Sequence, residues 1–477
     1  MNLYGRGPLL SDLSQRLDAV RRSGRGQLLA VQGRRQVGKS TVITAFVEAS
    51  AVPYVYLTAV KRAPAGHQLA ALARATSEAR VPFPDAEVLF GAAPATWTEA
   101  LNRIALVARG GPVIVVIDEF PWAVEQSATL EGELQVAWDT RLEHLPVLFV
   151  LVGSDLAMME RLNDHDRPLF GRAQPLVVPP LNPAEIAQAL PDAVAIEVFD
   201  AHLITGGYPR LVRSCVAAGS PREYVRQALG SDTSDLVVTA RLTLAAEFPD
   251  SPAAASVLRA IGAQAVAVPT FNDVVAGMSD AADNAARTAL TRALTVLTRT
   301  KRMVEIEVPA GSPASSKLRR YVITDPYLRF WFAFVQEEVD NIARGRADLA
   351  LARFERSWES WRGVAVEPVV RESVWRLASS HPRLQGVESV GAWWNRRGDV
   401  EVDLVARDRQ GVTAIGTVKW RGAEPITSGE VRELMAVRTR LGADEQALLI
   451  GVCPAGARTS ELDLVFDAGD LLSAWSV

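Results

Sequence analysis

The hydrophobic and polar positions of the first 180 residues follow two alternating patterns. Between short apolar runs, apolar residues recur every three or four positions, as at Leu9, Leu13 and Leu17, which is typical of one face of a helix. The apolar runs are rich in β-branched residues, as expected for strands that a parallel sheet buries on both faces. They cover 27–32, 52–57, 112–119, 146–152 and 174–178. Strands that alternate with helices predict an α/β fold with a parallel sheet.

The pattern changes after residue 180. Short amphipathic helices are predicted up to about residue 247, the first of them capped by Asn182 with Pro183 at its first position. Two more helical stretches precede a pair of segments with alternating polarity, which predict a hairpin. These four elements cover 254–263, 284–300, 304–308 and 318–323. Helices followed by a hairpin in this order predict a winged helix.

The loop after the first strand carries the clearest chemical pattern. Residues 33–41, GRRQVGKST, fit G-x-x-x-x-G-K-[ST] between a strand and a helix. Such a loop directs its backbone N–H groups and a helix N-terminus at phosphate oxygens. Lys39 is expected to contact the β- and γ-phosphates, and the Ser40 hydroxyl to bind Mg²⁺. The predicted ATP-binding residues of the loop are Gly33, Arg34, Arg35, Gln36, Val37, Gly38, Lys39, Ser40 and Thr41.

Two later strands end in polar side chains where parallel sheets bind ligands. Residues 112–119 end in Asp118, a predicted partner of Mg²⁺, and Glu119, a predicted general base for the attacking water. The strand 146–152 is followed by Ser154, which fits a sensor of the γ-phosphate and equally fits the cap of the next helix. The strand order suits the branch of P-loop proteins in which an added strand separates the P-loop strand from the acidic one and a catalytic glutamate is usual.

Length and composition set wider bounds. A chain of 477 residues is too long for one core and suggests three or four domains. The net charge of −4 argues against a strongly cationic nucleic-acid binder. Cys215 and Cys453 form no C-x-x-C pair, so neither a disulfide framework nor a cysteine zinc site is expected. The apolar runs are too short to span a membrane, and the first residues do not resemble a signal peptide, so a cytoplasmic location is expected.

Several motifs together resemble a family of archaeal and bacterial AAA+/STAND-like ATPases over nearly the whole chain. They are Tyr4-Gly5-Arg6, GRRQVGKST, VIVVIDEF, LVGSDLAMM, the PLFGR of 168–172 and the GGYP of 206–209. The resemblance implies a P-loop ATPase core, a helical lid, a winged helix and a C-terminal restriction-endonuclease-like domain. We expect these domains at 1–180, 181–250, 251–345 and 346–477.

The resemblance also implies roles for residues outside the P-loop. Gly5 and Arg6 would border the adenine pocket. Gly207 and Pro209, in the GGYP turn, would close on the nucleotide from the lid. Arg172 would act as a charge sensor, either in cis or from a neighbouring copy.

The second helix and the hairpin of the predicted winged helix carry basic side chains suited to phosphate contacts. The candidates for DNA contact are Arg292, Arg299, Lys301, Arg319 and Arg320. Winged helices also serve as protein-packing arms, and this alternative stays open. The aromatic-rich segment 324–334 that follows is interpreted as inter-domain core rather than as a surface that stacks on bases.

The C-terminal segment matches most of a PD-(D/E)XK nuclease site. Glu367 lies on a predicted helix, and Asp403 and Lys419 lie on two paired strands, 398–405 and 412–420. Thr417 stands where this site needs Glu or Gln, and a neutral hydroxyl is a weaker ligand for a metal ion than a carboxylate. Glu401, on the same strand face as Asp403, is a possible substitute. We therefore expect a nuclease fold that has lost its activity.

Three functions follow from these patterns. The first is a Mg²⁺-dependent ATPase that acts as a switch or motor on DNA. The second is an ATP-regulated DNA endonuclease of the defence or repair type. The third is a regulatory protein that binds ATP tightly, turns it over little and uses its C-terminal half to bind partners. The sequence favours the first function, and the other two are its alternatives. The expected partners of the chain are ATP or ADP, DNA, and either further copies of itself or a regulatory protein.

Overall fold

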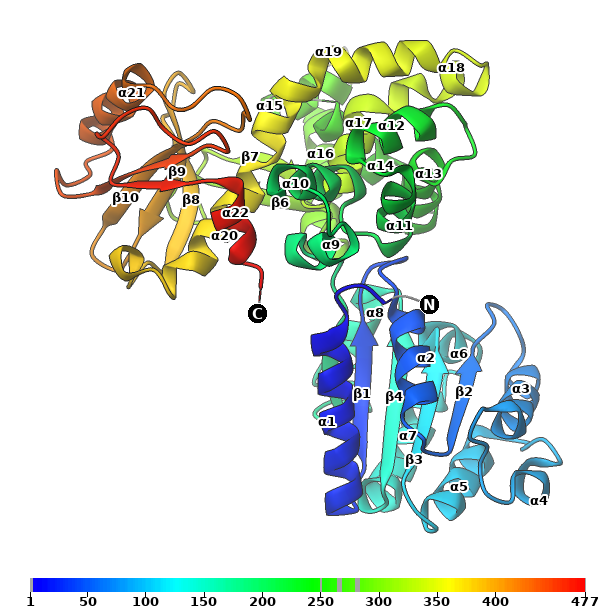
Figure 1. Ribbon diagram of the computed structural model, residues 1–477. Coiled ribbons are helices and arrows are strands. Elements are labelled where there is room, and N and C mark those ends of the chain that lie inside the picture. The colour runs from blue at the N-terminus through cyan, green and yellow to red at the C-terminus, as the bar shows by residue number, and fades with distance from the viewer. Residues whose placement is uncertain (1–2, 249–250, 264–267, 279–283, 477) are drawn as a thin grey trace. The chain divides into compact units, whose positions relative to one another are not determined.

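The computed structural model describes residues 3–248, 251–263, 268–278 and 284–476, and two compact units divide the chain (Figure 1). The first unit is Met1–Pro180 and the second is Leu181–Val477. The finer division of the second unit into lid, winged helix and nuclease-like domain stays a prediction.

A five-stranded parallel sheet forms the centre of the first unit. Its strands are β1 (Gln27–Gln32), β2 (Tyr54–Thr58), β3 (Val113–Asp118), β4 (Val147–Gly153) and β5 (Ala173–Val177). Their order is β2-β3-β4-β1-β5, so β4 lies between the P-loop strand β1 and the acidic strand β3. In register, Gln32 is opposite Gly153 and Val177, and Thr58 is opposite Asp118. The predicted P-loop fold is confirmed, and the carboxyl ends of its strands meet at one edge.

Helices cover both faces of this sheet because alternate strand residues point to opposite sides. On one side, Val115 and Phe149 belong to a buried core with side chains of α5 and α7, such as Ile104 and Trp138. In Figure 1, α1 and α2 lie in front of the strands. The helices of this unit are α1 (Gly7–Ser23), α2 (Lys39–Ala49), α3 (Ala65–Glu78), α4 (Ala86–Phe90), α5 (Trp97–Ala108), α6 (Phe120–Gln126), α7 (Leu130–Thr140), the 3₁₀ turn η1 (Leu142–His144) and α8 (Leu156–Arg161).

The second unit begins with helices. The N-cap predicted at Asn182 is present, because its side chain accepts from the N–H of Glu185. The Glu185 carboxylate accepts in turn from the N–H of Asn182 and so completes a capping box. The helices before the hairpin are α9 (Pro183–Ala189), α10 (Ala195–Thr205), α11 (Pro209–Ala218), α12 (Pro221–Leu229), α13 (Asp235–Glu247), α14 (Pro252–Gly262), α15 (Phe271–Met278) and α16 (Asn284–Thr295), which continues as the π-helical turn η2 (Val296–Thr300). Leu290, Leu294 and Leu297 are buried, as their spacing predicts.

Two sheets follow. The hairpin pairs β6 (Val304–Glu307) with β7 (Arg320–Ile323) in antiparallel fashion. The C-terminal sheet has the order β12-β11-β10-β9-β8. Its strands are β8 (Ser389–Trp394), β9 (Glu401–Arg407), β10 (Val412–Val418), β11 (Leu448–Val452) and β12 (Leu464–Phe466). The strands β8, β9 and β10 are antiparallel, and β10, β11 and β12 are parallel.

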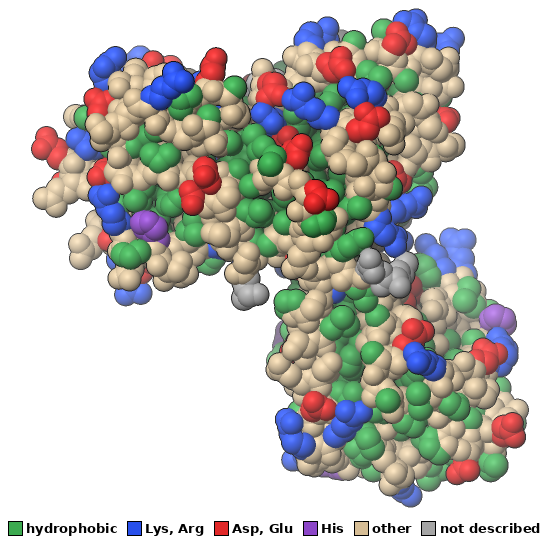
Figure 2. Space-filling model, viewed as in Figure 1, with side chains coloured by type: hydrophobic (Ala, Val, Ile, Leu, Met, Phe, Trp, Pro, Cys, Tyr) green, Lys and Arg blue, Asp and Glu red, His purple; other side chains and the backbone are tan. Residues whose placement is uncertain are grey.

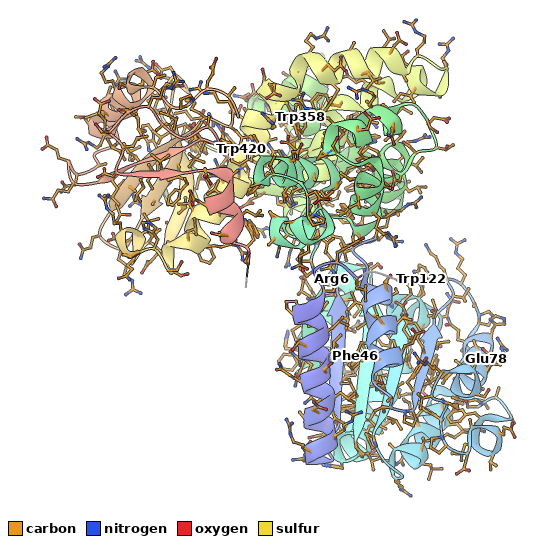
Figure 3. The ribbon with its side chains drawn as sticks, in the orientation of Figure 1. Arg6, Phe46, Glu78, Trp122, Trp358 and Trp420 are labelled. Atoms are coloured by element: carbon orange, nitrogen blue, oxygen red, sulfur yellow. The ribbon has the colours of Figure 1, made fainter. Side chains whose placement is uncertain are left out.

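An aromatic core links the hairpin to the C-terminal sheet along the chain. Trp358, which is labelled in Figure 3, stacks on Trp361 with ring centroids 5.5 Å apart. Both rings contact Phe330 and Phe334. The helical elements of this region are α17 (Pro326–Phe334), η3 (Gln336–Glu338), α18 (Val339–Ala343), α19 (Ala347–Ala365), α20 (Glu367–Ala378), η4 (Pro382–Leu384), α21 (Ser428–Arg440) and α22 (Ala468–Ser473). The aromatic residues of α17 are buried, as their interpretation as core predicts.

On the face that Figure 2 shows, basic and acidic side chains are interspersed on each unit. No helix of the described residues combines the length and the apolar character that crossing a membrane requires.

Candidate nucleotide site

The P-loop connects the end of β1 to the start of α2. Gln36 and Gly38 have positive φ angles of 66° and 92°, so the backbone turns back on itself before Lys39 begins the helix. Only glycine fits at residue 33, because an added Cβ would lie 2.4 Å from the carbonyl oxygen of Val178. The loop is therefore pressed against the segment that leaves β5. Its N–H groups precede a helix N-terminus, an arrangement that suits phosphate oxygens.

Two buried cations hold the loop in this shape. Lys39 Nζ donates to the carbonyl oxygens of Gly33 and Arg34, at 2.8 and 2.9 Å. Arg6 Nη2 donates to the carbonyls of Val37 and Pro179, both at 2.9 Å. Figure 3 shows Arg6 at the end of the first unit toward which β1 runs. Arg6 thus ties the P-loop to the chain after β5, which is a structural task that the sequence did not predict. The expected adenine contact of Gly5 and Arg6 stays a prediction.

The acidic residues at the end of β3 belong to a row of hydrogen bonds. Asp118 is buried, and its Oδ1 accepts from the N–H of Glu119 at 2.9 Å. Glu119 Oε1 accepts from Ser154 Oγ at 3.1 Å. Residues that end β3 and follow β4 are thereby joined across the sheet edge beside the P-loop strand.

The capping role that the sequence left open for Ser154 belongs to its neighbour. Asp155 is the N-cap of α8, and its side chain accepts from the N–H of Met158 at 3.0 Å. The Ser154 hydroxyl is thereby left to donate to Glu119. Gly153, just before it, leaves room for α8 and for the start of α6, since a Cβ there would lie 2.4 Å from the sulfur of Met159.

Tyr56 is a member of this row that sequence reasoning missed. Its Oη donates to Asp118 Oδ2 at 2.8 Å from the neighbouring strand β2. Burial and the negative charge of Asp118 raise the Tyr56 pKa far above its ordinary value, so the phenol remains a donor. The hydroxyls of Ser40 and Thr44 also interact with Tyr56. A tyrosine in a strand gives no sequence signal of this kind, because the contact depends on which strand lies beside β3.

The residues fit ATP and Mg²⁺ in their chemistry. Hydroxyl and carboxylate oxygens are the ligands that Mg²⁺ prefers, and such sites complete its coordination with phosphate oxygens and water. Ser40 on α2 and Asp118 on β3 both interact with Tyr56, so they face the same space. Among the described residues, no cluster of three or more His, Cys, Asp or Glu that could hold a metal ion occurs. A P-loop site requires none, because only two protein side chains are expected to contribute.

Arg172 does not belong to this site. It precedes β5, whose first residue, Ala173, is opposite Leu28 near the start of β1. Since the strands are parallel, Arg172 lies at the edge of the sheet opposite the P-loop. Its guanidinium makes a bidentate pair with Asp139, with distances of 2.6 and 2.8 Å, and this pair lowers the Asp139 pKa. This position separates Arg172 from the P-loop of its own chain and does not favour a role in cis, and the predicted charge-sensor role stays a prediction.

The GGYP turn is shaped by contacts within the second unit. Gly207 has a φ of 72°, and an added Cβ would lie 2.0 Å from the carbonyl oxygen of Leu181. Its own carbonyl accepts from the N–H of Leu181 at 2.8 Å. Tyr208 Oη donates to Asp325 Oδ2 at 2.5 Å, and Pro209 begins α11. The expected contact of Gly207 and Pro209 with the nucleotide stays a prediction.

The five DNA-contact candidates have unlike surroundings. Arg292 and Arg299 are exposed on α16 and η2. Lys301 Nζ pairs with Glu247 at 2.9 Å. Arg319 donates to the carbonyls of Ser316 and Ala314. Arg320 is bidentate to Glu401, at 2.6 and 3.0 Å, so this guanidinium already has a carboxylate partner.

Three of the four nuclease candidates line one cavity of about 330 Å³ in the C-terminal sheet: Glu401, Asp403 and Lys419. Asp403 Oδ2 accepts from Thr417 Oγ1 at 3.1 Å and from the N–H of Val418 at 2.8 Å. Glu367 begins α20, and burial together with the charge of Asp403 raises its pKa to about 8. The nuclease reading stays a prediction.

Two family descriptions match parts of this chain. Residues 2–150 match the AAA ATPase domain. Residues 331–433 match a family of archaeal and bacterial proteins of unknown function. The chain is also 23% identical, over 415 residues, to an uncharacterized protein of Methanocaldococcus jannaschii, and the match covers 86% of either chain.

Two solved structures are similar at low identity. The Walker-type ATPase of Pyrococcus abyssi is 18% identical with a TM-score of 0.47, and the match covers 69% of this chain and 96% of that one. The ORC2 protein of Aeropyrum pernix, solved in ADPNP–ADP complexes, is also 18% identical with a TM-score of 0.47, over 75% and 96% of the two chains. The assignment of the first unit depends on the match to the AAA ATPase domain and on the order of the strands, and it does not use these two structures. The first unit of this chain is a P-loop ATPase domain of the AAA+ class.

Proposed function

We propose that this protein is a Mg²⁺-dependent ATP-hydrolysing switch whose second unit acts on DNA. The observation that carries the hydrolytic part is the hydrogen-bonded row Tyr56–Asp118–Glu119–Ser154 beside the P-loop strand. If Glu119 served only to begin the helix α6, its carboxylate would not need the hydrogen bond that it accepts from Ser154.

Each residue of the row has a task in this proposal. Glu119 accepts a proton from the attacking water as a general base. The Ser154 hydroxyl, by donating to Glu119 Oε1, orients the carboxylate for that task. Asp118 and Ser40 hold the metal, and Tyr56 orients Asp118. Lys39 leaves the carbonyls of its own loop to contact the phosphates. Bound Mg²⁺ supplies positive charge that offsets the charge building up on the phosphate oxygens.

The DNA part of the proposal is supported by the element order of the second unit. Three helices, α14, α15 and α16, precede the β6–β7 hairpin, as in a winged helix. Exposed Arg292 and Arg299 on the third helix supply charges for phosphate contacts. Nucleotide-dependent closure of the lid is the proposed link between the two units.

The decisive variant is Lys39→Ala. It removes the charge that is expected to grip the phosphates, so ATP binding should be lost. Isothermal titration calorimetry on the pure, folded chain measures this directly, and phosphate release with and without DNA measures turnover. Wild-type binding with negligible release under both conditions would favour the regulatory alternative. Plasmid nicking with Mg²⁺ that disappears in Lys419→Ala would favour the endonuclease. Undiminished ATP uptake by Lys39→Ala would overturn the site.

A further inference from the structure

We propose that a basic pocket between the β6–β7 loop and the β8–β9 turn binds the phosphate backbone of a nucleic acid. The pocket has a volume of about 540 Å³. Three segments form its walls: the start of α15, the loop that leads into β7, and the turn after β8. The proposal rests on the DNA association proposed above and assigns it to a place other than α16.

The charge of this pocket is of one sign. Its lining includes Lys317, Arg319, Arg320, Arg396 and Arg397, and no carboxylate among the described residues that form its walls. Glu401 neutralises Arg320. Lys317, Arg396 and Arg397 are exposed, and none of the described acidic side chains forms an ion pair with them or with Arg319. Several cations gathered in one cavity repel one another unless an anion enters it.

The two walls that carry these charges are fixed to each other. Arg320 on β7 lies over the Trp394 ring, with its Cζ 4.2 Å from the ring centroid, and pairs with Glu401. Trp394 and Glu401 are opposite residues of β8 and β9, so one arginine clamps the hairpin onto a cross-strand pair. The N–H of Ala310 also donates to the carbonyl of Ala392 at 2.8 Å. The pocket is therefore a built feature of the second unit.

Local hydrogen bonds fix the backbone of the two segments that carry the basic side chains. In the β8–β9 turn, Asn395 accepts from the N–H of Gly398 through both its carbonyl and its side chain, and Gly398 has a φ of 75°. Arg396 and Arg397 are the two central residues of this turn, where side chains project from the sheet. On the other wall, Arg319 Nε donates to the carbonyl of Ser316 at 2.9 Å and so stiffens the loop that bears Lys317.

The shape of the charge distribution favours a nucleic-acid backbone over a small anion. The cations come from two separate segments across an open cavity, which suits phosphates repeated along a chain. Trp394 is buried beneath Arg320, so no exposed ring of this turn is offered to a base. Binding should accordingly depend steeply on salt and little on sequence.

The test is fluorescence anisotropy of labelled oligonucleotides with the full chain, between about 50 and 200 mM salt. Single-stranded DNA, double-stranded DNA and RNA are measured side by side, with polyglutamate as a non-nucleic polyanion. Arg396→Ala/Arg397→Ala should weaken nucleic-acid binding about tenfold or more and reduce the slope of log K against log salt by about 1.5. The charge-matched control Arg356→Ala/Arg432→Ala, at exposed positions outside the pocket, should change neither.

The outcomes separate this proposal from the one it rests on. If the wild-type chain binds none of the oligonucleotides, DNA association and the pocket fail together. If wild-type binding survives Arg396→Ala/Arg397→Ala but is lost in Arg292→Ala/Arg299→Ala, only the pocket fails and α16 is the contact. Tighter binding of polyglutamate than of any oligonucleotide would overturn the nucleic-acid assignment. A wild-type urea-unfolding transition of the second unit in the pocket variant, followed by tryptophan fluorescence, shows that the pocket is folded, so a loss of binding then supports the proposal.

Discussion

At the scale of single residues, Glu119 has a backbone that its residue type seldom adopts. Its φ of 53° lies in the left-handed region, which costs about 1 kcal/mol or more outside glycine. The conformation places its carboxylate against Ser154 Oγ on the neighbouring strand end. Backbone strain of this kind clusters at functional sites, so its presence at a strand end beside a P-loop agrees with the proposed catalytic role of Glu119.

We predict that Glu119→Gln still binds ATP and hydrolyses it at least about a hundredfold more slowly, because the amide cannot accept the proton of water. Ser154→Ala should slow hydrolysis less, about tenfold, since it removes only the donor that orients the carboxylate. Phosphate release under single-turnover conditions, with ATP affinity measured by calorimetry, separates the two steps. Hydrolysis by Glu119→Gln at the wild-type rate would show that the general base lies elsewhere.

At the scale of elements, the sequence predicted those whose pattern is local. The five strands of the first sheet appear within two residues of their predicted limits, and Asn182 caps its helix as predicted. Two short helices were not predicted, α4 (Ala86–Phe90) and α6, which begins directly after Glu119. Each is too short to show a helical period in its sequence.

The partners of site residues are less predictable than the elements. Tyr56 reaches Asp118 only because β2 pairs with β3, and Arg172 is remote only because β5 runs parallel to β1. Neither of these strand relations can be predicted from the spacing of residues along the chain. The P-loop was predictable because all of its chemistry lies within nine consecutive residues, 33–41.

The GGYP turn permits a prediction at this scale. Gly207→Ala should destabilise the second unit by about 3 kcal/mol or more, because its Cβ would strike the Leu181 carbonyl in addition to a positive φ. Gly219→Ala is the matched control: it has a φ of 86° with nothing within 4 Å of the added Cβ, so it should cost only about 1–2 kcal/mol. Urea unfolding followed by tryptophan fluorescence measures both. Equal losses would mean that the backbone of Leu181 yields to the methyl group.

At the scale of the whole molecule, ion pairs cross the boundaries predicted within residues 181–477. Arg371 on α20 pairs with Glu307 on β6 at 3.0 Å, and Arg320 pairs with Glu401. Arg362 on α19 pairs with Asp200 on α10 at 3.1 Å, with both side chains 7% exposed. These contacts join helices of the predicted lid, the hairpin and the C-terminal segment, which accounts for the single compact unit that they form.

The buried pair has a defined dependence on pH. Burial raises the pKa of Asp200 to about 6, although the charge of Arg362 opposes the rise. An unfolded aspartate titrates near about 3.9, so between these values the folded state binds more protons than the unfolded state. The contribution of Asp200 to stability is therefore full below about pH 4 and falls as the pH rises through about 6.

Arg362→Met removes the ion-pair partner and leaves the Asp200 carboxylate in place. The free energy of unfolding should therefore fall further as the pH rises. At pH 7 the variant should lose about 3–5 kcal/mol, because an ionised Asp200 would be buried without its countercharge. At pH 5 the carboxyl can bind a proton instead, and the loss should be clearly smaller. Arg346→Met, at a pair with Asp348 whose side chains are 59% and 61% exposed, should change the stability little at either pH, because water screens the pair. Urea unfolding at the two pH values distinguishes the cases. If Arg362→Met loses the same stability at both pH values, the arginine stabilises the contact between α10 and α19 through its packing and not through its charge.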